Sequence, residues 1–519
     1  MSRAVGAQPG PNSADGALAR LPSDLAPLRD EAFGYEHAQR LLWRAGFGGT
    51  PKQIATLAGW GLDRAVDHLV RYDSIPFRAD TDGGFDANIM REPSEEERAA
   101  YRRALASRNE DAVARFRLER QRAQRDDRRQ MLSIRGWRLE RLSETPRPLE
   151  EKLALFWHGH FATSYRTIEN SHHMLMQNRL FRKHAAGNFG ELLRAIIRDP
   201  AMLAYLDNND SSKREPNENL ARELMELFSL GEGNYSERDI QEGARALTGY
   251  TFRNNTFYFN ERNHDGGSKS ILGVQGTLDG DDFVRAILAS RDCPLFIAST
   301  LYRFFVADLP TNERDQDPAT RAYVRSLAGL LAKSKYELGP VLRAMFRSRH
   351  FFEASDRNEQ IKSPVTLAVG AIRSLNAPPR SLSAVLDGLD RMGQSLFYPP
   401  SVKGWDGGRA WINTSTLFVR QNLLVYLLTG AKPGGFGEPD TEYAYDPSAL
   451  LASLADAEPG AERDADRVAG YLLRLTLGRS PAPVQRRIAA FVREHGGPKP
   501  DVITGALLLV TAMPEYQLC

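Results

Sequence analysis

The chain has 519 residues, with 42% hydrophobic and 26% charged residues and a formal net charge of +2 at pH 7. This length can bury a sizeable core, in two to four domains or in one large helical body. The near-balanced charge gives no sign of a nucleic-acid-binding protein. Cys293 and Cys519 are the two cysteines, which excludes a disulfide-stapled scaffold.

The first 30 residues are rich in glycine, proline, alanine and serine, and they contain no apolar segment of the length that a signal peptide needs. We therefore predict a disordered lead-in at residues 1–30 and, by default, a cytoplasmic protein. No apolar run in the sequence approaches about 18 residues, so no membrane span is expected.

Helical periodicity begins near Tyr35 and continues to about residue 430, where apolar residues recur at spacings of three and four. Residues 94–143 within this body are rich in arginine with interleaved acids and have no internal proline, which predicts a long surface helix or a helical hairpin. A stripe of arginines can bind phosphates, but the acidic residues between these arginines favour a solvated face with salt bridges.

Aromatic and polar residues alternate from Thr251 to Asn260, and turn residues follow at 265–267. This pattern predicts a small β-ribbon or an irregular insert near residues 250–275. Residues 431–447 are predicted to be a linker, and residues 448–519 are predicted to be helices packed on the core. The expected fold is thus mainly α, a multi-helix globular body over residues 31–430 with a C-terminal group of helices.

One face of the predicted helix at residues 216–230 is unusually polar. Five side chains fall within an arc of about 140°, opposite a leucine and phenylalanine face: Glu218, Asn219, Arg222, Glu223 and Glu226. This face can be a solvated surface, a structural ion-pair ladder or the wall of a pocket. We predict that it is mostly buried against the next helix, at residues 236–249, and that Arg222 or Arg245 bonds a carboxylate of the other helix.

Histidines and oxygen ligands suggest two candidate metal sites. His158 and His160 lie on either side of Gly159 in the motif "WHGHF", and imidazoles with carboxylates suit zinc or iron. The alternative is that these histidines bond backbone groups between packed helices. Asp207, Asn209 and Glu218 have the spacing of ligands in a calcium loop, but Ser212 replaces the expected glycine, and a helix-capping loop is the favoured alternative.

Two loops carry further candidate groups. His264 and Asp265 precede two glycines in "HDGGSK", a weak anion-binding pattern without the Walker spacing. The loop "GWDGGRAWIN" combines indoles with polar groups, the combination that binds sugar rings, although a packed structural loop is also consistent with it. Its candidate ligand-binding residues are Trp405, Asp406, Arg409, Trp411 and Asn413.

A set of motifs occurs in this order along the chain: "EKLALFWHGHFATS", "QNRLFRKHAAGNF", "DPAMLAYLDN", "PNENLARELMELFSLGEGNYSERDIQEGARALTGYTF", "HDGGSKSILG", "MGQSLFYPPSVKGWDGGRAWINTSTL" and "MPEYQL". In this set the chain resembles the bacterial family called domain of unknown function 1800, from about Tyr35 to Cys519. The resemblance implies a mostly helical protein and a partner of the alkaline phosphatase-like family encoded nearby. Many relatives carry an export signal, which this sequence lacks, and no catalytic residue is carried over.

The leading hypothesis is a hydrolase-like or ligand-binding pocket for a polar, carbohydrate-like substrate. It would be formed by the 216–230 helix, the "WHGHF" turn and the 263–269 loop. Its candidate catalytic residues are Glu223, Glu226, Arg222, His264 and Asp265, its further ligand-binding candidates are Asn217 and Asn219, and its candidate cofactor is a divalent metal ion. The alternative is a non-catalytic interaction scaffold with a buried ion-pair network.

Overall fold

The structure, a computed structural model, describes residues 20–77, 84–357, 360–377, 381–431 and 445–519. Within these ranges it contains 24 α-helices and two antiparallel two-stranded sheets, which confirms the prediction of a mainly α fold with a small β insert. Residues 1–19 of the predicted lead-in and residues 432–444 of the predicted linker lie outside the described residues. None of the described helices is long and apolar enough to cross a membrane.

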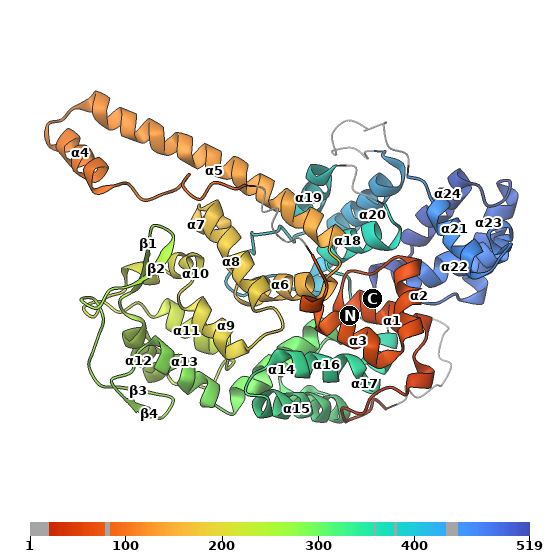
Figure 1. The fold of residues 1–519 in the computed structure, drawn as a ribbon, viewed down its shortest axis with the longest axis horizontal. Helices are drawn as coiled ribbons and strands as arrows, with labels where there is room; N and C mark the ends of the chain where they lie inside the picture. The colour runs from red at the N-terminus through yellow and green to blue at the C-terminus, as the bar shows by residue number, and fades with distance from the viewer. Residues whose placement is uncertain (1–19, 78–83, 358–359, 378–380, 432–444) are drawn as a thin grey trace, which may run out of the picture.

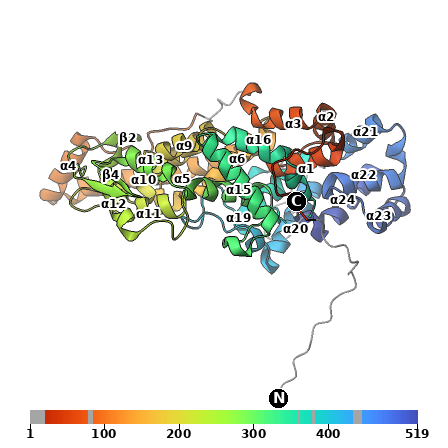
Figure 2. The same ribbon diagram turned by 90° about the horizontal axis from the view of Figure 1, so that it is seen from below.

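The helices follow one another along the chain, as Figure 1 shows: α1 (Tyr35–Ala45), α2 (Pro51–Trp60), α3 (Leu62–Val70), α4 (Glu95–Ala106), α5 (Glu110–Glu144), α6 (Pro148–His160), α7 (Tyr165–Ile168), α8 (Ser171–Lys183), α9 (Phe189–Ile196), α10 (Pro200–Tyr205), α11 (Asn219–Glu226), α12 (Glu237–Leu247), α13 (Gly280–Ala289), α14 (Asp292–Phe305), α15 (Pro318–Lys333), α16 (Leu338–Arg347), α17 (Arg349–Asp356), α18 (Pro364–Ser374), α19 (Leu382–Arg391), α20 (Thr414–Thr429), α21 (Ser448–Ala457), α22 (Ala465–Leu477), α23 (Ala482–Glu494) and α24 (Pro500–Thr511). The strands are β1 (Tyr250–Arg253), β2 (Thr256–Phe259), β3 (Lys269–Ile271) and β4 (Val274–Gly276). In both views, α4 and the β insert lie at one end of the molecule and α21–α24 lie at the other (Figures 1 and 2).

Helix α6 lies at the centre of the fold, and every residue from Pro148 to His158 is buried. It contacts α1, α3, α5 and α8. Pro148 occupies the first turn, where the missing amide hydrogen costs nothing, and acidic residues follow it, which suits the positive end of the helix dipole. A helix buried on all sides must have partners for its polar groups as well as for its apolar ones.

Glu151 on α6 is the centre of a buried ion-pair cluster. Its carboxylate bonds Arg138 and Arg141 of α5, and Arg182 of α8 donates from Nε to Oε1 at 2.7 Å. Glu151 is 0% exposed and Arg138 is 2% exposed. Because a carboxylate in this environment is stable only with its cationic partners, the cluster fixes α5, α6 and α8 relative to one another.

The arginine-rich segment forms a helical hairpin of α4 and α5, which extends from one side of the molecule in Figure 1. The C-terminal half of α5 is anchored in the body through buried residues such as Met131 and Ile134. The outer half is mostly exposed, and near the middle of α5 Arg129 pairs with Asp126 at 3.1 Å. The exposed charges agree with the solvated face that the interleaved acids predict.

The β insert follows α12 directly. Strand β1 pairs with β2 and strand β3 with β4, and helix α12 contacts β3. Gly249, between α12 and β1, has φ of 78°, and a Cβ there would lie 2.5 Å from the carbonyl oxygen of Asn260. Only glycine allows this close approach, which folds the insert back on α12.

The end of the chain returns to the centre of the molecule. Ile361 and Leu518 form an isolated antiparallel bridge, and the amide of Cys519 donates to the carbonyl of Gln360 at 2.9 Å. Helix α24 contacts α20, and α21 contacts α2. The last residues therefore lie beside the segment that leads into α18.

Glu151→Gln is expected to lower the free energy of unfolding by about 3–5 kcal/mol, because it removes the negative charge that compensates three buried arginines. Urea denaturation measures this change. The matched control is Asp126→Asn in the exposed pair with Arg129, where about 0.5 kcal/mol or less is expected. Equal, small effects of both substitutions would contradict the assigned role of Glu151.

Candidate functional site

A cavity of about 1300 Å³ opens between the end of α6, the end of α11, α14 and two non-helical segments. The non-helical segments are residues 360–363 and 402–408. The lining comes from parts of the chain more than 400 residues apart, from Trp43 to Cys519. Such a large concave site, where polar groups from distant segments meet, is the usual place for a ligand.

One wall of the cavity is aromatic. Trp405 and Trp411 of the "GWDGGRAWIN" loop line it together with Phe156, Phe296 and Phe304. The ring centroid of Trp405 lies 5.7 Å from that of His158. Within the described chain, the indole Nε1 of Trp405 is buried and has no hydrogen-bond partner.

The Trp405 loop packs closely against the end of α6. Gly404 has φ of 80°, and a Cβ at this position would lie 2.1 Å from the carbonyl oxygen of Gly159. Glycine at position 404 therefore allows the close approach that places Trp405 against the "WHGHF" turn.

A second part of the lining, which we call the cationic floor, consists of Arg44 of α1, Lys152 of α6 and Lys362 before α18. Their exposed fractions are 2%, 6% and 7%. Arg44 donates to Gln360 and to the carbonyl oxygen of Cys519, Lys152 donates to Thr366 Oγ1 at 3.1 Å, and Lys362 donates to the carbonyl of Tyr516 at 2.7 Å. Burial lowers the pKa of both lysines to about 8.

The lining also contains acidic groups and one histidine: Glu226, Glu232, Asp292, Asp308, Glu313, Asp406 and His160. Glu226 Oε2 accepts a hydrogen bond from the hydroxyl of Tyr235 at 2.7 Å. Burial lowers the pKa of His160 to about 4, so its ring is neutral near pH 7. A neutral imidazole and a carboxylate in one cavity are groups that can exchange protons with a ligand.

The two histidines of "WHGHF" bond backbone carbonyls. Nε2 of His158 lies 3.2 Å from the oxygen of Thr163, and Nε2 of His160 lies 2.9 Å from the oxygen of Phe228. This is the arrangement of the alternative interpretation, in which the histidines join packed segments. Among the described residues, no group of three or more histidine, cysteine or acidic side chains has an arrangement that could hold a metal ion.

The segment of the proposed calcium loop makes local contacts through the backbone of Asp207, the side chain of Glu218 and the neighbouring Asn208. The backbone carbonyl of Asp207 accepts from Asn217 Nδ2 at 3.2 Å, and Glu218 bonds Arg222 at 3.2 Å. Asn208 beside Asn209 donates to the carbonyls of Leu247 and Tyr250. The segment thus ties the start of α11 to the start of the β insert.

The polar face of α11 is divided between two environments. Arg222 bonds Glu237 at the start of α12 with Nη2–Oε1 at 2.5 Å, so the predicted link to the other helix is present. The side chains of this pair are 35% and 63% exposed, and none of the five polar residues on the face is buried, so the prediction of a mostly buried face is wrong. Glu223 is half-buried, and burial together with Glu226 raises its pKa. Of the five polar residues on this face, Glu226 reaches the cavity.

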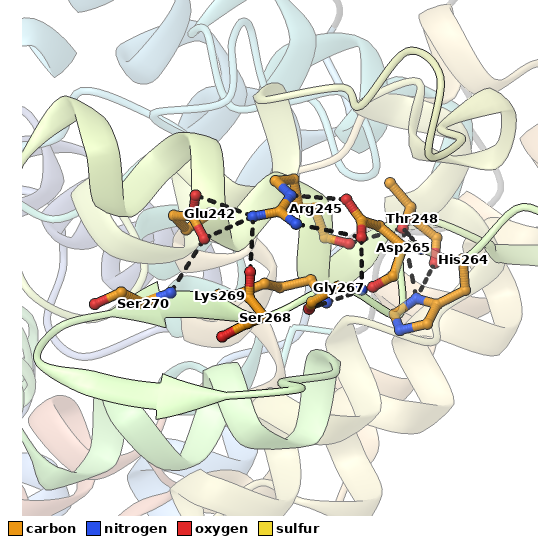
Figure 3. Close-up of polar contacts among 9 residues, drawn as sticks. All are labelled: Glu242, Arg245, Thr248, His264, Asp265, Gly267, Ser268, Lys269 and Ser270. Atoms are coloured by element: carbon orange, nitrogen blue, oxygen red, sulfur yellow. Dashed lines mark hydrogen bonds and ion pairs between the residues drawn. The ribbon is translucent and has the colours of Figure 1, made fainter.

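The 263–269 loop does not line the cavity. Figure 3 shows it bound to α12 through Arg245, which donates from Nε to Asp265 at 2.7 Å and from Nη1 to Glu242 and the carbonyl of Ser268. His264 Nδ1 lies 2.9 Å from the carbonyl of Thr248. The ion pair with Arg245 lowers the pKa of Asp265 to about 2. The groups of this loop thus hold it on α12 and the β insert.

Three of the remaining candidates, Asn219, Arg409 and Asn413, do not line the cavity. Asn413 caps α20, accepting from the amide of Thr416 at 2.9 Å, and Asn219 is the first residue of α11, where its amide donates to Asn217 Oδ1. Arg409 is exposed in the short helix at Gly408–Trp411. Trp405, Asp406 and Trp411 are the members of this loop that line the cavity.

Sequence reasoning missed the cationic floor. In the sequence, Lys152 is a cation that follows two glutamates and precedes the apolar run of "KLALFW". The approach of Arg44 and Lys362 depends on contacts between segments about 300 residues apart, and no local pattern signals it.

The fold and the site define a mainly α protein with a large cavity lined by aromatic and charged side chains. A family model described as "Protein of unknown function (DUF1800)" matches residues 40–518. The chain therefore belongs to this family, which confirms the resemblance in its motifs. No curated protein and no solved structure matches the chain.

The buried histidines predict a pH dependence of stability. Burial lowers the pKa of His158 to about 4, against about 6.5 in an unfolded chain. As the pH falls below 6.5, the unfolded state binds a proton that the folded state does not, so the free energy of unfolding falls by about 1.4 kcal/mol per pH unit for this residue until about pH 4.

His158→Gln should remove this contribution from the slope between pH 6.5 and pH 4.5, measured by urea denaturation at several pH values. The exposed His495 supplies the matched control, since His495→Gln should keep the wild-type slope. An unchanged slope in the His158 variant would show that this histidine titrates as it does in the unfolded chain.

Proposed function

We propose that the cavity binds a small polar organic ligand of a carbohydrate-like class. The observation that carries this proposal is the meeting of Trp405, Trp411 and several ionisable groups in one cavity of about 1300 Å³. Indole rings bury the apolar faces of sugars while neighbouring polar groups bond the hydroxyls. The unpartnered Nε1 of Trp405 adds a buried donor that a ligand hydroxyl can satisfy.

Glu226 and His160 support hydrolysis or group transfer as the reaction class at this site. Glu226 is positioned by the hydroxyl of Tyr235, and His160 is positioned by the carbonyl of Phe228. A positioned carboxylate serves as a general base, and a neutral imidazole accepts or relays a proton. In this proposal Glu226 and His160 replace His264 and Asp265 as the acid–base candidates, because the cavity contains the former pair.

The alternative, an interaction scaffold, has its support in ion pairs between elements. Arg222 links α11 to Glu237 of α12, and Arg245 links α12 to the 263–269 loop. These pairs are partly exposed, and such pairs contribute little to stability. The pairs favour a structural role for α11, α12 and the 263–269 loop. The alkaline phosphatase-like partner remains a prediction.

A sugar that binds the wild-type protein and perturbs its fluorescence should bind Trp405→Ala about tenfold more weakly or not at all. Loss of the indole contact is expected to cost about 1.4 kcal/mol, which corresponds to tenfold in affinity. The screen uses neutral and acidic oligosaccharides with intrinsic fluorescence and calorimetry. Trp60→Phe is the matched control, since Trp60 packs on His68 and Arg64 outside the cavity. Equal sugar affinities of the wild type and Trp405→Ala would contradict the proposal. The absence of a fluorescence or calorimetric response of the wild type to any sugar would also contradict it.

A further inference from the structure

The cationic floor presents more positive charge than the protein itself compensates. Arg44, Lys152 and Lys362 line it, and the guanidinium of the fully buried Arg420 lies behind Lys362, donating to its carbonyl at 2.7 Å. Within the described chain, no side-chain carboxylate lies within ion-pair distance of these four groups. Buried charges without such partners are costly.

Cys519 supplies the negative charge that all four cations feel, and Asp308 acts on Arg44 from a longer range. Cys519 and Asp308 together are still fewer than the four cations, so the group keeps an excess of positive charge. The cause of the lowered pKa of Lys152 and Lys362 is first of all burial, which agrees with this incomplete compensation.

The floor also retains unused hydrogen-bond donors. Nε of Arg44 is buried without a partner in the part of the chain that the structure describes. The ammonium of Lys152 has one hydrogen bond, to Thr366, and otherwise faces the rings of Phe47 and Phe304 at 4.7 and 5.7 Å. An ammonium group has three donors, so Lys152 and Lys362 keep donors for a further acceptor.

Lys269 is a buried lysine whose ammonium group has both hydrogen-bond acceptors and carboxylates of the chain nearby. It is 2% exposed, and its ammonium donates to the carbonyls of Asp265 and Gly267. The charges of Asp265 and Glu242 also attract it. The lysines of the cationic floor lack such carboxylate neighbours.

We propose that the cationic floor binds an anionic oxygen group of the ligand, a carboxylate, sulfate or phosphate. This inference rests on the proposed function and narrows the ligand to an acidic one, such as an acidic sugar. Arg44, Lys152 and Lys362 supply charge-assisted hydrogen bonds to the anionic oxygens. Ser363, Thr366 and Gln394 in the same lining supply neutral polar groups around them.

The test measures the thermal midpoint and the calorimetric affinity with sulfate, phosphate and acetate at constant ionic strength. Lys152→Met removes one charge and keeps a side chain of similar length that packs on Phe47 and Phe304. It should raise the dissociation constant of the bound anion at least tenfold. Lys269→Met, outside the cavity, is the matched control and should keep the wild-type affinity. Because salts stabilise proteins generally, the difference between the two variants is decisive.

Gln394→Glu is a second variant with nearly the same shape. Gln394 Oε1 accepts from the amide of Val365 at 2.9 Å, an interaction that a carboxylate also makes. The new charge should raise the melting temperature without ligand and weaken anion binding at least tenfold. If Lys152→Met does not fold, Gln394→Glu gives the answer alone.

Glucuronate and glucose, and sulfated and phosphorylated glucose, then identify the anionic group that an organic ligand carries. Binding of glucose as tight as that of every acidic derivative would overturn the inference and leave the proposed function intact. Unchanged anion affinity in Lys152→Met and Gln394→Glu, or no anion binding by the wild type, would also overturn it. Loss of all sugar binding, with anion binding retained, would count against the proposed function instead.

Discussion

The buried ion-pair cluster around Glu151 is the interaction on which the rest of the structure depends. Its carboxylate compensates arginines from α5 and α8, and it lies on a helix that is buried from Pro148 to His158. The next residue, Lys152, lies about 100° further around α6 and lines the cavity. One helix thus couples the charge network of the core to the charged surface of the cavity.

The two groups of buried charge differ in how they are compensated. Around Glu151, cations surround an anion of the chain, and the helices bonded in this way hold each other in place. At the cationic floor, Arg44, Lys152 and Lys362 face a cavity, and the stabilising partner is a ligand that the folded state binds. Such a ligand stabilises the folded state by mass action. Binding of an anion in the cavity therefore offsets the free-energy cost of burying these three cations.

The sequence predicts the elements well where the signal is local. Helical periodicity predicts the helices, and the alternation from Thr251 to Asn260 predicts β1 and β2. It also predicts a link between α11 and α12 through Arg222 or Arg245, and Arg222 forms it with Glu237. The exposure of that link depends on what covers α11 and α12, which no local pattern contains.

The cavity also could not be predicted from local sequence patterns, because distant segments of the chain form it. The motifs direct attention to Glu226, His160 and Trp405, which line it, and equally to His264 and Asp265, which bind α12 elsewhere. Charged side chains in a loop look alike in sequence whether they bond a ligand or a neighbouring helix. Arg44 and Lys362 come together where the last residues of the chain pack beside residues 360–361. This contact joins segments that are far apart in the sequence.

The most direct measurement is anomalous diffraction from crystals soaked in selenate, a tetrahedral dianion that locates itself by its own scattering. The account predicts a selenium peak in the cavity, with selenate oxygens within hydrogen-bond distance of at least two of Arg44, Lys152 and Lys362. Peaks confined to the protein surface, with water alone against these three side chains, would contradict it.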